Sequence, residues 1–506
     1  MTATATVGAA LEWWAKAQPT DPAYVFPDET IDYATAEHWS SRLALQLKNS
    51  GISEGDRVGV LAPNGAAWPI AALGVIKTGA VLVPLNPRFK PAELRSILND
   101  SGAVAVIAAD ELKGTVEDAN QLGDAVNLIT FSEVQALRDG EAETFRIDRE
   151  VDEPISIIFT SGSTGRSKGV VLTNRTLMSI VFEASLTEDG FHRRNTSILV
   201  LPLAFTPGLV WGLLMSTVLG GKLVIETDLV PSRVVSQIEE HRVEAIFGVP
   251  LIYQAIASAP EFQTADLSSL TTAVVGGAAV PGPLLETWAA KDVALRQIYG
   301  MTEAGGIATH TLAKDFREHP ATCGSGLIFT KVKVVREDGS DAVPGEQGEL
   351  VISGPGVTPG YWNDPATNAQ VFRDGWLHSG DLGTVEDGRV RFVDRLKDLI
   401  ITGGINVSPV ELEQVIASIE GVAEVAVIAA PDEKFGETPA AIITAAEGLD
   451  EATVVAKASE QLADYKVPRY VVLRKDPLPR LPNGKISKTE IRAEYKDLTT
   501  THAKVR

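Results

Sequence analysis

Short, unbroken runs of valine, isoleucine, leucine and alanine alternate with helix-length segments through the first half of the chain. Such runs occur at Arg57–Pro63, Ala80–Asn86 and Ala103–Ala109, and the segments between them, Ala66–Lys77 and Pro91–Asn99, have helical patterns. A strand that is apolar on both faces must be covered on both faces, as in a parallel sheet flanked by helices. The pattern returns at residues 155–160, 222–226, 245–247 and 273–275. We therefore predict an α/β fold with doubly wound sheets.

The chain of 506 residues is too long for one ordinary core, so more than one domain is expected. After about residue 340 glycine-rich turns and short strands predict a β-rich subdomain. A charged connector, Asp394–Asp398, follows, and a capped helix begins after Ser408, with Pro409 at its first position and Glu411 three residues after the cap. We predict a large N-terminal domain of residues 1–396 and a small, mobile α+β C-terminal domain of residues 397–506.

Charge and cysteine content exclude several classes of protein. A net charge of −21 and a pI near 4.9 argue against a nucleic-acid partner. A single cysteine, Cys323, excludes an intramolecular disulfide and suits a reducing cytoplasm. Residues 195–221 carry no charge and are long enough to span a bilayer, but Pro202, Pro207 and Gly208 interrupt them. We expect a buried strand, a loop and a buried helix there, with no integral membrane segment.

The strongest local signal is TSGSTGRSKGV at Thr160–Val170, directly after an apolar run. Glycines with small hydroxyl residues let backbone N–H groups surround an anion, and Lys168 adds a positive charge. The segment is not a Walker loop, because Gly-Lys-Ser/Thr is missing at the required spacing. Taken alone, it could equally be a flexible turn.

Four further segments follow in order: YGMTEAGG at Tyr299–Gly306, DGWLHSGDLG around Asp381, DRLKDLIITGGINVSPVELE from Asp394, and PRLPNGKISK around Lys485. Each could be an ordinary loop by itself. Together, from about Leu11 to Arg492, the five segments resemble the adenylate-forming superfamily, which includes acyl- and aryl-CoA synthetases, firefly luciferase and the adenylation domains of peptide synthetases. The resemblance implies an ATP-dependent acid–CoA ligase that uses ATP, Mg²⁺ and coenzyme A.

The resemblance implies how the nucleotide is held. The β- and γ-phosphates of ATP would lie against Thr160, Ser161, Gly162, Ser163, Thr164, Gly165 and Lys168. Thr302 would contact the α-phosphate, and Glu303 would bind Mg²⁺. Tyr299 would stack on adenine beside Gly300. The loop with Gly277 and Ala278 would lie between adenine and the acid.

The ribose and the second substrate are assigned in the same way. Asp381 would accept hydrogen bonds from the ribose hydroxyls, with Arg395 supporting the same nucleotide. Lys485 would bridge the attacking carboxylate and the α-phosphate, where a cation stabilises the transition state. Lys397 matches the family's hinge, around which the C-terminal domain would rotate between the two half-reactions. The remaining assignments concern coenzyme A and are Gly403, Gly404 and Arg88, the last being as consistent with an ordinary surface charge.

The acid pocket implied by the resemblance is apolar. Its walls would be Phe205, Pro207, Trp211, Phe247, Gly277, Gly300, Gly305, Gly306 and Ile307. Phe205 stands where many relatives have a histidine, and would act as a gate beside the substrate carboxylate. Amino-acid-activating relatives have an aspartate in this segment that is missing here. A hydrophobic acid is therefore favoured, with medium-chain, aromatic and alicyclic acids all open.

Two alternatives remain at this stage. An adenylating enzyme of this kind could load a carrier protein instead of free coenzyme A, although the chain has no carrier-type serine motif. A non-catalytic acyl or nucleotide sensor is less favoured, because Lys168, Glu303, Asp381, Arg395 and Lys485 are all present. We expect a monomer or homodimer.

Overall fold

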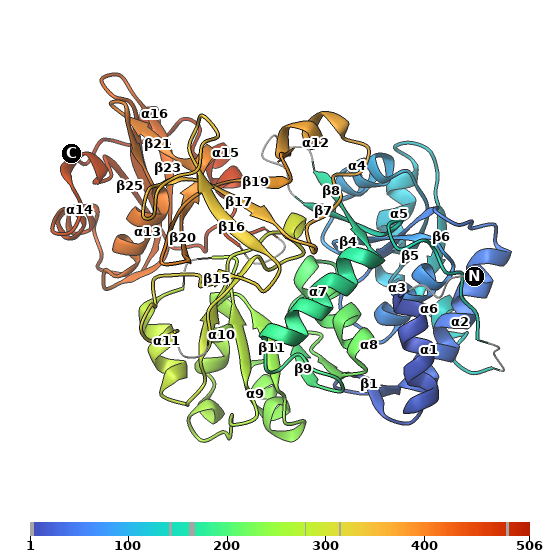
Figure 1. Cartoon of the computed structure of the whole chain (residues 1–506). Helices are drawn as coiled ribbons and strands as arrows, with labels where there is room; N and C mark the ends of the chain where they lie inside the picture. Colours follow the sequence, from blue (N-terminus) through green and yellow to red (C-terminus); the bar gives the residue numbers. More distant parts are fainter. Residues whose placement is uncertain (1–4, 141–143, 161–166, 279, 313–314, 482–484) are drawn as a thin grey trace. The chain divides into compact units, whose positions relative to one another are not determined.

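The computed structural model describes the chain except residues 1–4, 141–143, 161–166, 279, 313–314 and 482–484 (Figure 1). The chain divides into two compact units. Unit 1 consists of Met1–Val332 and Ile352–Leu377, and unit 2 consists of Lys333–Val351 and His378–Arg506. The predicted α/β class is confirmed, because unit 1 contains two sheets of mainly parallel strands.

The first sheet of unit 1 has six strands in the order β6-β5-β3-β4-β7-β8. The bounds are β3 Arg57–Leu61, β4 Val81–Leu85, β5 Ala103–Ala108, β6 Asn127–Thr130, β7 Pro154–Thr160 and β8 Lys168–Thr173. All neighbours are parallel except β7 and β8, which form a hairpin. The connecting helices are α3 Ala67–Lys77, α4 Pro91–Ser101 and α5 Lys113–Asn120. The strands and helices predicted between residues 57 and 109 are therefore confirmed within a few residues.

The second sheet has seven strands in the order β13-β12-β11-β9-β10-β1-β2. The bounds are β1 Pro22–Val25, β2 Thr30–Asp32, β9 Thr196–Leu199, β10 Lys222–Ile225, β11 Ala245–Gly248, β12 Thr272–Val275 and β13 Leu295–Gln297. Only the β1–β2 pair is antiparallel. Its crossover helices are α9 Pro231–Glu240, α10 Pro250–Ala257 and α11 Gly282–Ala289. One hydrophobic core joins residues of both sheets.

The uncharged segment at residues 195–221 forms a strand, a loop and helical turns, as predicted. After β9 the chain forms a π-helix, Pro207–Leu214, which continues into α8, Met215–Leu219. π-helical turns are rare and are frequent at functional sites. Within the described part of the chain, every helix is too short or too polar to cross a lipid bilayer.

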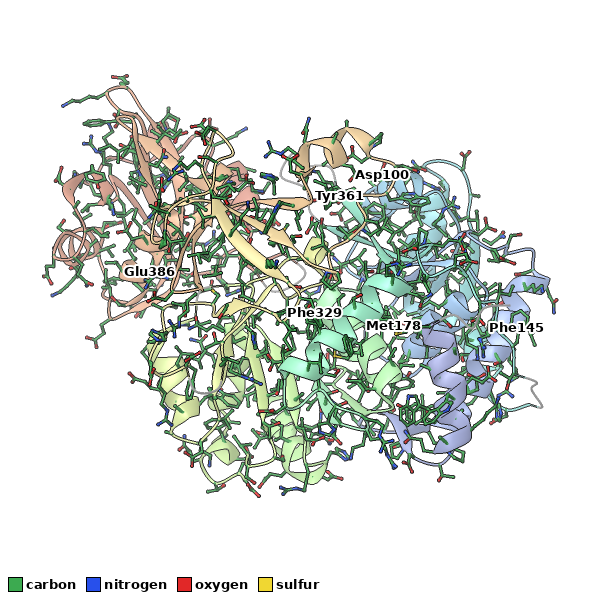
Figure 2. All side chains as sticks on the ribbon, in the orientation of Figure 1. Asp100, Phe145, Met178, Phe329, Tyr361 and Glu386 are labelled. Carbon is green, nitrogen blue, oxygen red and sulfur yellow. The ribbon has the colours of Figure 1, made fainter. Side chains whose placement is uncertain are left out.

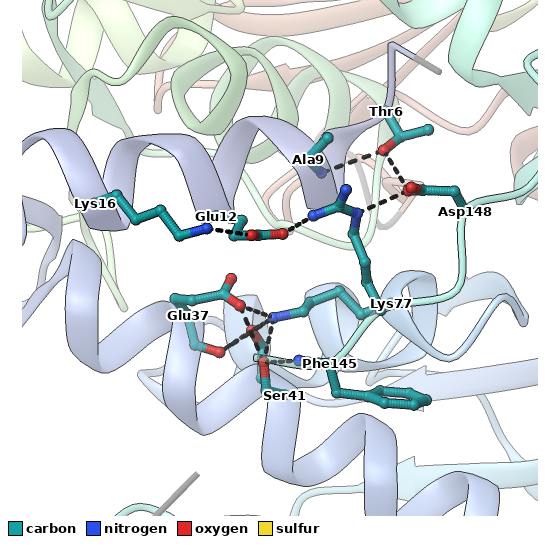
Figure 3. A network of polar contacts seen from close by, with 11 residues as sticks. Thr6, Ala9, Glu12, Lys16, Glu37, Ser41, Lys77, Phe145 and Asp148 are labelled. Atoms are coloured by element: carbon teal, nitrogen blue, oxygen red, sulfur yellow. Dashed lines mark hydrogen bonds and ion pairs between the residues drawn. The ribbon is translucent and has the colours of Figure 1, made fainter. Parts of the chain in front are cut away.

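The N-terminal helices add a buried charge pair that the sequence did not reveal (Figure 3). Helix α2, Tyr33–Asn49, packs against α3, and Lys77 of α3 lies 2.7 Å from Glu37 of α2 with both side chains almost fully buried. The Lys77 ammonium also donates to Ser41 Oγ at 2.6 Å. Burial lowers the pKa of Lys77, while the Glu37 carboxylate opposes that shift.

Unit 2 contains a β-hairpin, which belongs to the sheet β16-β17-β19-β18 with β20 paired to β19, and a separate five-stranded sheet. In the first of these sheets the bounds are β16 Lys331–Val335, β17 Gly348–Ser353 and β18 Phe372–Arg373. The hairpin joins β19, Trp376–Glu386, to β20, Arg389–Arg395. The five-stranded sheet has the order β22-β21-β24-β23, with β25 paired to β24. Its strands and helices are β21 Ile400–Thr402, β22 Ile405–Val407, α13 Pro409–Ala417, β23 Val422–Asp432, β24 Gly436–Ala445, α14 Glu451–Ser459, β25 Tyr470–Arg474, α15 Lys488–Glu494 and α16 Leu498–Thr501.

Successive side chains of β23 point to opposite faces of this sheet, and each face is covered by helices. Val425 and Val427 belong to one core with α13 and α14, whereas Ala426 and Ile428 belong to another with α15 and α16. The predicted cap of α13 is confirmed, since Ser408 Oγ accepts a hydrogen bond from the Glu411 amide. The predicted division into domains of residues 1–396 and 397–506, with the second domain mobile, stays a prediction.

Candidate active site

The glycine-rich loop connects the two antiparallel strands β7 and β8. Thr160 and Lys168 are register partners at the ends of these strands, and Thr160 Oγ1 donates to the Lys168 carbonyl at 3.4 Å. Residues 161–166 lie outside the described residues, and so do the predicted phosphate contacts of Ser161, Gly162, Ser163, Thr164 and Gly165. The hairpin brings both described ends of the loop to one edge of the six-stranded sheet.

A short 3₁₀ turn, Thr302–Ala304, carries the predicted α-phosphate and metal contacts. Glu303 is only 7% exposed, and its Oε1 accepts a 2.7 Å hydrogen bond from the Tyr361 hydroxyl. The Thr302 hydroxyl lies 2.8 Å from that of Thr206, which precedes the π-helix. Burial, followed by the Glu303 carboxylate, raises the pKa of Tyr361 well above its ordinary value, so its hydroxyl keeps the proton that it donates.

Tyr361 also contacts Lys168, which follows the glycine-rich loop, and the sequence alone did not single out Tyr361. Lys168 Nζ lies 5.2 Å from the centre of the Tyr361 ring, within the range of a cation–π contact. The only sequence signal was an aromatic pair after glycine at Gly360–Trp362, which is common in ordinary loops.

Tyr299 and the neighbouring glycines form a tightly packed stretch of backbone. Tyr299 is buried, and its amide donates to Thr309 Oγ1 at 2.9 Å. A Cβ on Gly300 would stand 2.2 Å from the Gly306 carbonyl oxygen, so only glycine fits there. Gly277 and Ala278 follow β12 and are exposed.

The predicted acid pocket centres on Trp211 of the π-helix. Its indole N–H donates to the Gly305 carbonyl at 2.8 Å, and the ring is 4% exposed. The ring lies 6.1 Å from that of Phe247 and 5.7 Å from that of Phe191. A side chain on Gly306 would collide with the Trp211 indole at 2.6 Å. Of the other predicted wall residues, Ile307 is buried, whereas Phe205 and Pro207 are half-buried.

Arg88 lies in the loop between β4 and α4. It is exposed, and its backbone amide donates to Asn86 Oδ1 at 3.0 Å. This position suits a contact with a soluble substrate and equally an ordinary surface charge, so the coenzyme A contact stays a prediction.

In unit 2, Asp381 lies on β19 directly opposite Arg395 on β20. Asp381 is 8% exposed, and its Oδ1 lies 3.7 Å from Arg395 Nε. The Asp381 amide donates to Ser379 Oγ at 3.0 Å, and that hydroxyl donates to the Leu350 carbonyl at 2.6 Å. The local strand geometry therefore holds a carboxylate and a guanidinium together.

Lys485 lies in the same electrostatic environment. Burial lowers the pKa of Lys485 to about 8, the positive charge of Arg395 acts in the same direction, and Asp381 opposes it. The Lys485 carbonyl accepts a 2.7 Å hydrogen bond from the Leu481 amide. The structure thus brings together Asp381, Arg395 and Lys485, although the first and the last are more than a hundred positions apart in the sequence.

The predicted hinge residue and the two glycines assigned to coenzyme A follow Arg395 in the chain. Lys397 is in a 3₁₀ turn, Leu396–Asp398, and its pKa is lowered by burial and then by Arg395. Gly403 and Gly404 form the turn between β21 and β22 with φ of 58° and 81°, where other residues are strained.

The donor set around Glu303 fits Mg²⁺. Mg²⁺ prefers oxygen ligands and is usually held by one or two carboxylates together with water and substrate phosphates. Glu303 supplies one buried carboxylate, and the Thr302 hydroxyl belongs to the same short turn.

Comparison with known proteins gives the family context. The family model described as AMP-binding enzyme matches residues 11–362, and the AMP-binding enzyme C-terminal domain matches residues 411–485. The chain is 38% identical to a feruloyl-CoA synthase of Amycolatopsis sp, over 92% of this chain and 94% of that one. It is 35% identical to a long-chain-fatty-acid–CoA ligase of Mycobacterium tuberculosis, over 97% and 98%. The solved o-succinylbenzoate coenzyme A synthetase of Bacillus subtilis, in complex with ATP and magnesium ion, is similar with a TM-score of 0.85 and 27% identity, over 96% and 99%.

Proposed function

Because the chain belongs to the AMP-binding enzyme family and is an AMP-forming acyl-CoA synthetase, we propose that it ligates a hydrophobic carboxylic acid to free coenzyme A. The observation that carries the choice of acid is the aromatic wall of the pocket, in which Trp211 is anchored to Gly305 and lies beside Phe247. This wall offers apolar surface and no charged group to an incoming acid. Ring-containing acids fit an aromatic wall best and are the first to test.

The first half-reaction joins the acid to ATP. A carboxylate oxygen attacks the α-phosphorus, and the bond between the α-phosphorus and the α,β-bridging oxygen breaks. Pyrophosphate departs, and the acyl-adenylate is formed. Both reactants are anions, so their approach is opposed by charge repulsion. We assign Lys485 to bridge the carboxylate and α-phosphate, and Lys168 to the leaving phosphates. Mg²⁺ held by Glu303 and the phosphates would neutralise further phosphate charge.

We assign the nucleoside contacts residue by residue. Asp381 offers carboxylate oxygens to the ribose hydroxyls, and Arg395 fixes that carboxylate across the strand pair. Tyr299 provides an aromatic ring for adenine, and Thr302 a hydroxyl for the α-phosphate.

In the second half-reaction the thiol of coenzyme A attacks the acyl carbonyl, the thioester bond forms and AMP leaves. An acyl-adenylate is a mixed anhydride, so little further activation is needed. We assign the backbone at Gly403 and Gly404 to the thiol arm, because glycine leaves room beside a turn. Lys397 is the proposed hinge around which the C-terminal domain rotates between the two half-reactions. Arg88 is proposed to contact the nucleotide part of coenzyme A.

The experiment that tests this function measures pyrophosphate release with ATP and Mg²⁺ across fatty, aromatic and alicyclic acids, with and without coenzyme A. Acid-dependent release, accelerated by coenzyme A, together with the mass of an acyl-CoA product, is expected. Release that coenzyme A leaves unchanged would contradict the free-thiol acceptor and indicate a carrier protein. If none of the acids caused pyrophosphate release, the assignment as an acid–CoA ligase would be contradicted.

A further inference from the structure

The segment Thr358–Trp362 lies against the strand that leaves the phosphate loop. Tyr361 forms an antiparallel bridge with Val170 of β8. The Trp362 amide donates to the Gly169 carbonyl at 2.7 Å, and the Val171 amide donates to the Gly360 carbonyl at 3.1 Å. The backbone of this segment therefore extends the β7–β8 sheet edge that positions Lys168.

The same segment is bonded to the turn that carries Glu303. The Thr358 amide donates to the Glu303 carbonyl at 2.8 Å, and the Thr358 hydroxyl donates to the Val171 carbonyl at 2.7 Å. Two elements separated by more than a hundred residues, β8 and the Thr302–Ala304 turn, are thus joined through one short stretch of chain.

Tyr361, labelled in Figure 2, is the side chain that contacts a charged group on each element. Its hydroxyl donates to Glu303 Oε1 at 2.7 Å, and its ring lies 5.2 Å from Lys168 Nζ. The hydrogen bond fixes one carboxylate oxygen and with it the direction of the other, Oε2. The ring holds a cation on its face, near the loop end where the β- and γ-phosphates are proposed to bind.

We propose that Tyr361 is a positioning residue that sets the Glu303 carboxylate for the metal ion of the ATP complex and Lys168 for its phosphates. The proposal rests on the ATP and Mg²⁺ assignment made above, and goes beyond it by naming the group that couples the two charges. Tyr361 touches neither reacting atom. Tyr361 holds Glu303 and Lys168 in place, so that these two side chains rearrange less when the nucleotide binds.

The two contacts can be separated by substitution. Tyr361→Phe removes the hydroxyl and keeps the ring, so it should disturb Glu303 and leave Lys168 in place. Tyr361→Leu removes both contacts. Tyr24→Phe is the matched control, because the buried Tyr24 hydroxyl is 2.8 Å from Thr217 Oγ1 in the same unit and takes no part in the proposed site.

The test is calorimetric titration of the full-length chain with ATP, once with EDTA and once with Mg²⁺. The dissociation constant of ATP in EDTA divided by that in Mg²⁺ measures how much the metal ion strengthens nucleotide binding. For Tyr361→Phe we expect this ratio to fall about tenfold, with the EDTA value within about twofold of wild type. Tyr361→Leu should additionally weaken binding in EDTA about two- to fivefold. Tyr24→Phe should change neither value.

An unchanged ratio in Tyr361→Phe would overturn the proposal. This includes the case in which ATP binding is weakened equally with and without Mg²⁺, which is the result expected of a merely structural role. Thermal unfolding of each variant shows that the fold is retained. The wild-type titration separates the two levels of inference. If wild type binds ATP without any gain from Mg²⁺, the nucleotide assignment fails together with this proposal, whereas a normal wild type with an unaffected variant refutes Tyr361 alone.

Discussion

Asp381 and Arg395 face each other across the β19–β20 hairpin, with 3.7 Å between the carboxylate and guanidinium, and their opposite charges both act on Lys485. Burial and Arg395 destabilise the Lys485 cation, and Asp381 stabilises it. The resulting pKa of about 8 lies close to the working pH of most enzymes, so the protonation of this lysine should be visible in kinetics.

The first prediction concerns pH. Only the protonated Lys485 can bridge two anions, and the cationic fraction is lost as the pH rises through about 8. The rate of the adenylation half-reaction should therefore be constant below that value and fall up to about tenfold per pH unit above it. Lys485→Arg keeps a cation throughout this range, so its remaining activity should show no such fall. The same fall in Lys485→Arg would assign the titration to another group.

A second prediction separates the two half-reactions. Lys485→Ala should reduce pyrophosphate release by about 10²–10³-fold, because a cation at the transition state is lost. Thioester formation from a supplied acyl-adenylate should remain, since no phosphate charge is then attacked. The control is Lys475→Ala, which removes an exposed lysine of the same unit and should leave both half-reactions intact. Equal loss of both half-reactions in Lys485→Ala would refute the assigned role.

Much of the fold could be predicted from the sequence, because parallel strands buried on both faces leave an unbroken apolar pattern. Thus Arg57–Leu61, Val81–Leu85 and Ala103–Ala108 lie where the pattern predicted strands. The capped helix after Ser408 was predictable for a local reason, namely a hydroxyl that accepts from an amide three residues later.

Contacts between distant positions were not predictable. Tyr361 meets Glu303 and Lys168 only because the fold lays residues 358–362 along β8, and no local pattern encodes that pairing. Lys77 ends an apolar helix and gives the sequence signal of a surface charge, yet it is buried against Glu37 of another helix. A single sequence reveals local periodicity and motifs, whereas such pairs require the tertiary arrangement.

A third prediction concerns this buried pair. Lys77→Met leaves the Glu37 carboxylate buried without its cation, and should lower the free energy of unfolding by about 3–5 kcal/mol. The double variant Lys77→Met with Glu37→Leu should recover most of that loss, because both charges are replaced by apolar groups. Urea denaturation measures both values. Comparable losses in the single and double variants would show that the shape of the side chains matters more than their charge.

A fourth prediction concerns the acid. Trp211→Phe shortens the pocket wall and removes the hydrogen bond to Gly305, so larger acids should gain relative to compact ones. A change of about tenfold in the ratio of kcat/KM for a longer and a shorter acid is expected. Trp288→Phe is the control, because Trp288 is equally buried and donates to the Tyr253 carbonyl at 3.2 Å outside the predicted pocket. An unaltered acid preference in Trp211→Phe would remove Trp211 from the pocket wall.

The last prediction tests the turn proposed to line the path of the thiol arm. Gly404 has a φ of 81° and no atom of another residue within 4 Å of the position of a Cβ, so a larger side chain meets backbone strain but no collision within the described structure. Gly404→Leu should therefore fold, release pyrophosphate at nearly the wild-type rate, and form thioester at least about tenfold more slowly because the side chain occupies the path. Gly388, in the turn between β19 and β20, has a φ of 77° and equally open surroundings, so Gly388→Leu reproduces the strain without the obstruction. Measuring both half-reactions in both variants distinguishes the two effects. If Gly388→Leu loses thioester formation to the same extent, strain in unit 2 explains the defect and the turn at Gly404 has no special role.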